Sequence, residues 1–167
     1  QGYSSLLVSG LWLVYYTALF IVLGVMALYD KAHSYIPLSF LGGYLGLACM
    51  KLVLRFVENP DMSLLLAPVF VATPFLLIWV ITKGKGLGLG DVILFFGVGA
   101  FFGSLQGFAV LVISVWIGAL FGLYYKYVIK KKQTSATAIP FVPFIVLAFL
   151  IVLFTDIDII SIAMSFS

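Results

Sequence analysis

Two aspartates are the residues of this 167-residue chain best suited to chemistry. Asp91 ends a glycine-rich segment, residues 83–91, that separates two long apolar runs, and Asp30 follows another apolar run. An ionisable side chain at the edge of hydrocarbon is costly unless it is solvated or paired, so each aspartate needs a partner. Two carboxylates that meet share one proton and titrate as a unit. Such a pair can hydrolyse a peptide bond without a metal or another cofactor.

The expected reaction divides acid and base roles between the two carboxylates. The ionised member takes a proton from the attacking water, and the protonated member donates to the substrate carbonyl. Because Asp91 precedes an apolar run and Asp30 follows one, the helix dipoles favour Asp91 as the ionised member and Asp30 as the proton holder. Gly88 and Gly90 are expected to let the substrate backbone approach. We therefore expect a Gly90→Val protein to fold but to be inactive.

The composition excludes a soluble domain. Hydrophobic residues make up 64% of the chain, charged residues only 9%, and the mean hydropathy is +1.26. These values predict an all-α polytopic membrane protein, a bundle of six transmembrane helices. The chain has room for that bundle only as one transmembrane domain, residues 1–167, with no additional soluble domain. The single cysteine, Cys49, excludes an internal disulfide or a thiolate zinc site. The expected spans are 5–29, 36–57, 62–82, 91–106, 107–129 and 139–154.

The distribution of lysines predicts the orientation of these spans. If the spans alternate, the loops 30–36, 83–90 and 126–138 share one side and hold seven of the nine basic residues. The positive-inside rule makes this side cytoplasmic and places both termini outside. The three lysines at 130–132 predict contact with anionic lipid headgroups rather than with nucleic acid. Asp30 and Asp91 are the only acidic residues on the cytoplasmic side, where they can meet.

Other interpretations of these residues remain open. Asp91 could be only the N-cap of the fourth helix, and Asp30 could be only a solvated interfacial residue. His33 is given no role, because a lone interfacial histidine is usually a solvated turn residue. A small channel or proton-coupled transporter could also place two aspartates at one face. It would usually line its route with polar groups, and these spans hold few in their middles.

The motifs resemble those of the GxGD intramembrane aspartic peptidases, and among these the type IV prepilin peptidases. The resemblance is carried by Tyr29-Asp30 with Ile36-Pro37, by Gly88-Leu89-Gly90-Asp91, and by the segment Ile139-Pro140-Phe141-Val142-Pro143-Phe144. It extends from about residue 19 to residue 154. The Pro-Ala-Leu element of presenilin-like and signal-peptide-peptidase-like proteases is absent near the sixth span, where Ala138-Ile139-Pro140 stands, which favours the prepilin branch.

The resemblance implies a function and a set of site residues. Asp30 and Asp91 would be the catalytic pair, and the residues shaping the site would be Gly88, Gly90, Ile36, Pro37 and Pro140. The substrates would be prepilin-like, pseudopilin-like or archaellin-like precursors, cut after a basic leader at the cytoplasmic face of a prokaryotic inner membrane. An inactive homologue that only binds such proteins is an alternative, as is a presenilin-like protease. The sequence gives no oligomeric state.

The chain also departs from the family's pattern. Ile93 replaces the lysine that usually follows the GxGD aspartate by two residues, and Leu38 replaces the polar residue usual after Ile-Pro. Full-length bacterial members carry an N-terminal segment linked to N-methylation, which nothing here resembles. We therefore predict peptidase activity and make no prediction of methyl transfer.

Overall fold

The structure is a computed structural model that describes residues 2–33, 35–84, 87–125, 127 and 140–155, with side chains from residue 8 onward. These residues contain helices and no strand. The elements are α1 Gly2–His33, α2 Leu38–Glu58, α3 Met62–Thr82, α4 Leu89–Phe102, α5 Ser104–Tyr124 and α6 Val142–Thr155. The predicted all-α fold is confirmed.

Four of the described helices are long and apolar enough to cross a bilayer: α1, α2, α3 and α5. Helices α4 and α6 are also apolar but have only 14 residues each. At 1.5 Å per residue, each is about 21 Å long, shorter than a hydrocarbon core of about 30 Å. The two short helices therefore depend on their neighbours to cover their ends.

Helix α4 lies at the centre of the fold and packs against α2, α3 and α5. Nine of its 14 residues are buried, whereas α2 buries only three of its 21. Phe95 stacks on Phe75 of α3, with ring centroids 4.1 Å apart, and Phe101 contacts Phe149 of α6 at 4.9 Å. These ring contacts fix the depth of the helix that carries Asp91.

Small residues let α3 and α4 approach each other closely. A Cβ atom added to Gly99 would lie 2.6 Å from the carbonyl oxygen of Ala67 and 2.7 Å from the Cα atom of Pro68. Gly97 is equally constrained, because its added Cβ would collide with the ring of Tyr44 on α2. In contrast, Gly46 of α2 has nothing within 4 Å of such an atom. Close backbone packing of this kind is a common basis for helix association in lipid.

A glycine break separates α4 from α5. Gly103 adopts φ 87° and ψ −172°, a conformation that side chains rarely allow, and it both ends α4 and precedes α5. Arg55 of α2 lies beside this break and donates a hydrogen bond of 3.3 Å to the Phe101 carbonyl. A cation at a helix C-terminus satisfies free carbonyls and favours the helix dipole. The predicted fourth helix, 91–106, was wrong in running through this break.

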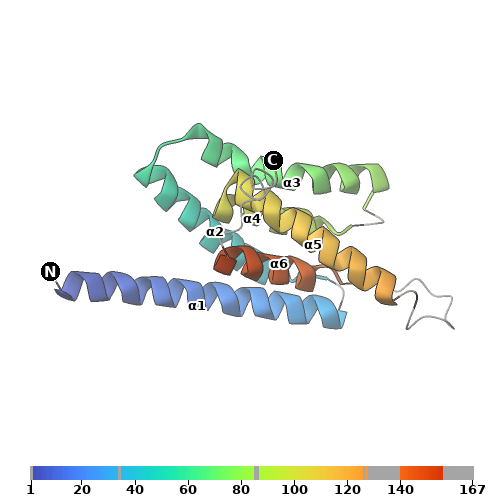
Figure 1. Ribbon diagram of the computed structural model, residues 1–167, viewed down its shortest axis with the longest axis horizontal. Coiled ribbons are helices and arrows are strands. Elements are labelled where there is room, and N and C mark those ends of the chain that lie inside the picture. The colour runs from blue at the N-terminus through green and yellow to red at the C-terminus, as the bar shows by residue number, and fades with distance from the viewer. Residues whose placement is uncertain (1, 34, 85–86, 126, 128–139, 156–167) are drawn as a thin grey trace, which may run out of the picture.

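Helices α1 and α6 run side by side and antiparallel, on the opposite side of the molecule from α3 (Figure 1). Near the C-terminus of α6, Phe154 stacks on Phe20 of α1 with centroids 6.2 Å apart. At the other end of the pair, the last turn of α1 meets the first residue of α6. This arrangement places Asp30 next to the motif that begins α6.

Candidate functional site

Asp30 is buried in the last turn of α1, with only 6% of its surface exposed. Its Oδ2 atom accepts a hydrogen bond of 3.1 Å from the backbone N–H of Val142, the first residue of α6. A helix N-terminus has free N–H groups and a positive dipole end, both of which suit a carboxylate. Because Asp30 and Val142 are 112 residues apart in the sequence, the motifs did not predict this hydrogen bond.

Asp91 lies in the first turn of α4, where an acidic side chain complements the helix dipole. It is not the N-cap residue, because Gly88 holds that position with extended backbone angles. The backbone N–H of Asp91 donates to the Gly88 carbonyl at 3.2 Å. The Asp30 and Asp91 carboxylates are close enough to repel each other electrostatically, so the structure brings the two predicted residues together.

Ile36 and Gly90 form a direct contact between the α1–α2 connection and the start of α4. A Cβ atom added to Gly90 would lie 2.9 Å from Cδ1 of Ile36. Pro37 follows as the N-cap of α2, and its carbonyl accepts hydrogen bonds from Phe40 and Leu41 at 3.1 and 3.2 Å. The Ile-Pro pair thus places one side chain on the glycine before Asp91 and begins the next helix.

Gly88 has a different environment from Gly90. It is exposed, and a Cβ atom added to it would lie 3.4 Å from Oδ2 of Asp91. Its φ of −74° and ψ of 146° are open to any residue, so backbone strain does not require glycine there. The absence of a side chain instead leaves the Asp91 carboxylate accessible from that side. The two glycines thus have different neighbours, and the expectation that both let the substrate backbone approach stays a prediction.

The rings of Tyr29, His33 and Tyr35 contact one another and hold the α1–α2 connection, which contains Ile36. The hydroxyls of Tyr29 and Tyr35 are hydrogen-bonded at 2.8 Å, and the Tyr29 ring stacks on His33 with centroids 4.3 Å apart. These contacts tie the connection back to α1. Sequence reading gave His33 no role and used Tyr29 only as part of a motif. The i, i+4 spacing of Tyr29 and His33 on one helix was the available signal.

Pro140 precedes α6 by two residues and is partly exposed. Phe141 follows it, and the Phe141 carbonyl accepts from Phe144 and Ile145 at 3.0 and 3.3 Å. Pro140 thus lies at the approach to the helix whose first N–H binds Asp30. The lysines at 130–132 fall outside the described residues.

The sequence predicted Asp91 as the base and Asp30 as the acid from the helix ends at which the two residues lie. The hydrogen bond from Val142 to Asp30 changes the basis of that prediction. That assignment placed Asp30 only at a helix C-terminus. Its side chain in fact reaches the N-terminus of a second helix, α6, so both carboxylates lie at positive helix ends. The helix dipoles alone therefore do not favour Asp91 as the ionised member.

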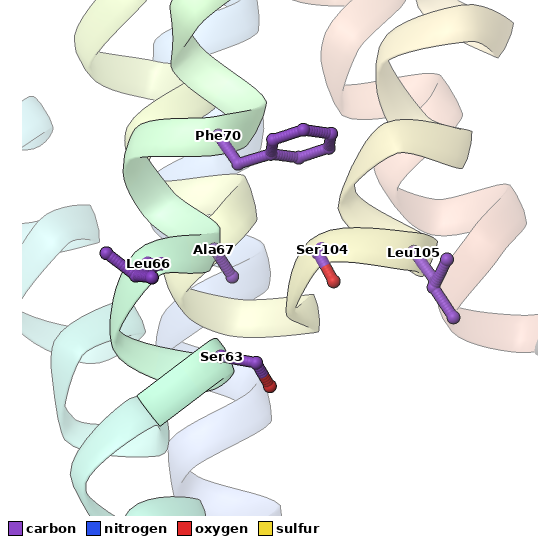
Figure 2. A pocket seen from close by; sticks show the side chains of 6 residues that line it. All are labelled: Ser63, Leu66, Ala67, Phe70, Ser104 and Leu105. Atoms are coloured by element: carbon purple, nitrogen blue, oxygen red, sulfur yellow. The ribbon is translucent and has the colours of Figure 1, made fainter. Parts of the chain in front are cut away.

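An apolar groove of about 330 Å³ lies between α3 and α5, away from both aspartates. Figure 2 shows it lined by Ser63, Leu66, Ala67 and Phe70 from α3 and by Ser104 and Leu105 from α5. Ser104 follows the C-terminus of α4, whereas Asp91 lies at its N-terminus, one helix length away. The groove does not belong to the candidate site.

Comparison with known proteins identifies the family of the chain. The family model described as the type IV leader peptidase family matches residues 17–123. No curated protein and no solved structure matches the chain. The matched range includes Asp30, Asp91 and the Ile36–Gly90 contact, and it covers more than half of the sequence. This membrane-embedded protein therefore belongs to the type IV leader peptidase family, a family of peptidases.

Proposed function

We propose that this protein is an intramembrane aspartic endopeptidase that removes the leader from prepilin-like precursors at the cytoplasmic face of a prokaryotic inner membrane. The observation that carries the proposal is the electrostatic interaction of Asp30 with Asp91, between the last turn of α1 and the first turn of α4. Family membership supplies the peptidase activity, and the two carboxylates supply the groups that perform it. Both termini lie outside in this proposal, and the lysine-bearing loops face the cytoplasm.

The proposed reaction uses one shared proton and one water molecule. One carboxylate takes a proton from the water as its oxygen attacks the scissile carbonyl carbon, and the other donates its proton to the carbonyl oxygen. The tetrahedral intermediate then collapses, the C–N bond breaks, and the leaving nitrogen receives a proton. The dyad finishes with one proton, as it began. Electrostatic repulsion between the two carboxylates is the reason one of them stays protonated.

The substrate reaches the dyad from the side that the glycine motif leaves open. Gly88 is exposed and lies against the Asp91 carboxylate, so an extended backbone can approach there without meeting a side chain. The many exposed apolar residues of α1, α2 and α3 provide a lipid-facing surface compatible with a substrate that has its own hydrophobic segment.

The test is cleavage by the full chain reconstituted in liposomes with a prepilin-like protein that carries a basic leader and a hydrophobic segment. We expect one new amino terminus, identified by mass spectrometry, and a rate that EDTA leaves unchanged because two carboxylates activate the water. Cleavage that stops with EDTA and returns with a divalent metal would contradict the aspartic mechanism. Failure to cleave any of a panel of prepilin-like proteins would contradict the substrate class.

Replacing Gly90 with valine should reduce cleavage about 100-fold while the bundle stays folded. Its side chain would meet Ile36, and a shift of about 1 Å in catalytic groups can cost this much in rate. Ile36→Ala in the same protein should restore at least a tenth of the wild-type rate, because it removes the atom that the new Cβ meets. A double variant as inactive as Gly90→Val would show that the valine acts on the substrate and not on Ile36.

A further inference from the structure

The first turn of α6 presents a single backbone donor toward Asp30. The first four N–H groups of a helix have no partner within the helix. Val142 is the first residue of α6, and Pro143, in the second position, has no N–H. The Phe144 N–H bonds to the Phe141 carbonyl at 3.0 Å. The N–H of Val142 is therefore the donor that the proline-containing motif leaves for the Asp30 carboxylate, and it is used at 3.1 Å.

The charged groups around Asp30 are few. Asp91 of α4 is near enough for the two carboxylates to interact electrostatically. Lys31 and His33 share the last turn of α1 but are exposed to solvent. Helices α3, α5 and α6 contain no charged residue, and the charged residues of α2 lie in its second half, away from Pro37. Within the described residues, Asp30 thus has a hydrogen bond from the Val142 N–H and an electrostatic interaction with the Asp91 carboxylate.

These two groups act in opposite directions. A hydrogen bond to a charged acceptor stabilises the charged form, and a neighbouring carboxylate disfavours it. Asp30 has an N–H donor from a second helix, and the antiparallel packing of α1 with α6 holds that donor in place. Asp91 has its own helix dipole, and the backbone N–H of Gly88 lies near its carboxylate. Among the described residues, however, the hydrogen bond of 3.1 Å from Val142 to Asp30 is the one of standard geometry that either carboxylate accepts from a backbone N–H. The arrangement favours the negative charge on Asp30 and the shared proton on Asp91.

We propose that the backbone N–H of Val142 is a positioning group that holds the Asp30 carboxylate and makes it the ionised member of the dyad, the base that accepts the proton of the water. Asp91 then donates its proton to the substrate carbonyl. This inference rests on the proposed peptidase function and reverses the roles expected from helix ends. It also assigns a structural role to the segment Pro140-Phe141-Val142-Pro143, which begins α6 so that one N–H group, that of Val142, is free to bind Asp30.

The experiment removes this N–H and keeps the side chain. Val142 is replaced through nonsense suppression by its α-hydroxy acid, so an ester replaces the amide, and the full chain is assayed in liposomes across a range of pH. Val142→Pro is the genetic equivalent, because proline is tolerated at the first position of a helix. Val142→Ala keeps the N–H and is the matched control for loss of the side chain.

On the acidic side of the pH–activity profile, cleavage requires the base, Asp30, to be ionised. If the Asp30 anion is less stabilised, this acid limb of the profile moves to higher pH. We expect the ester and proline proteins to move it upward by about one pH unit, the shift typical of a charge-assisted hydrogen bond. The alanine protein should keep the limb in its wild-type position, whatever its rate. An ester protein whose limb coincides with that of the wild type would overturn the proposal.

A second measurement does not depend on cleavage. Isotope-edited infrared spectra of Asp30 and Asp91 should show a carboxylate band from Asp30 and a protonated carboxyl band from Asp91 at neutral pH, and the ester should weaken the Asp30 carboxylate band. A protonated band that comes mainly from Asp30 would refute the assignment even if the wild type cleaves normally. A wild type that does not cleave would refute the proposed function, while the spectra would still decide the inference.

Discussion

Asparagine at Asp30 or at Asp91 should each abolish cleavage, by a factor of about 1,000 or more, and leave the helical bundle intact. Asparagine is nearly the same size as aspartate but neither accepts the proton of a water nor donates one to a carbonyl. Loss of a general acid or base typically costs 10²- to 10⁴-fold, and here a single residue serves in both steps of the reaction. At position 30, the amide oxygen can still accept from the Val142 N–H, so the packing of α1 on α6 is kept.

The matched control is Asp61→Asn. Asp61 is the exposed N-cap of α3, outside the membrane-spanning segments, and its carboxylate accepts from the Ser63 N–H at 2.9 Å. Hydrogen bonds from the side chain and backbone of Ser63 lower the pKa of Asp61, consistent with a capping role. Asparagine caps helices about as well as aspartate, so this variant should cleave at the wild-type rate. More than a tenth of wild-type activity in either the Asp30 or the Asp91 variant would contradict the dyad.

The largest effect on stability is expected from Gly99→Val. Its Cβ would lie 2.6 and 2.7 Å from backbone atoms of Ala67 and Pro68, and backbone atoms cannot rotate away as a side chain can. Helices α3 and α4 would have to separate, at a cost of about 3 kcal/mol or more. This corresponds to a fall in melting temperature of roughly 10 °C for a chain of this size. Thermal unfolding of the purified protein in detergent micelles measures it.

Gly46→Ala provides the control for this substitution, because nothing lies within 4 Å of the added atom. Alanine also has a higher helix propensity than glycine, so this variant should be as stable as the wild type or more stable by up to about 1 kcal/mol. A Gly99→Val protein that melts at the wild-type temperature would show that α3 and α4 do not pack as closely as described.

The sequence was sufficient for those features that depend on composition and local pattern. The span Met62–Thr82 was predicted with its bounds, because Asp61 caps its start and Lys83 begins a charged segment after it. The end of α4 was not predicted. Glycine is common within membrane helices, and only the positive φ of Gly103 shows that this one ends a helix.

The candidate site was likewise predicted only in part from the sequence. Alternation of spans was enough to predict that Asp30 and Asp91 share one face, and the two do interact in the structure. Their catalytic roles stay predictions until they are tested by mutation. The hydrogen bond from Val142 could not be predicted, since its donor belongs to the backbone and every residue except proline has one. The Ile36–Gly90 contact was equally hidden, although both residues had been identified from motifs.

The position of Asp30 on an outer helix has a consequence for how the enzyme would be controlled. Helix α1 packs on α2 and α6, and among the described residues it makes no extensive contact with α4, which is held by α2, α3 and α5. Asp30 is therefore held near Asp91 indirectly, through the packing of α1 on α2 and α6, and not by extensive contact between the two helices that carry them. A small movement of α1 against α2 and α6 would change the distance between the two carboxylates, and with it how readily they share a proton.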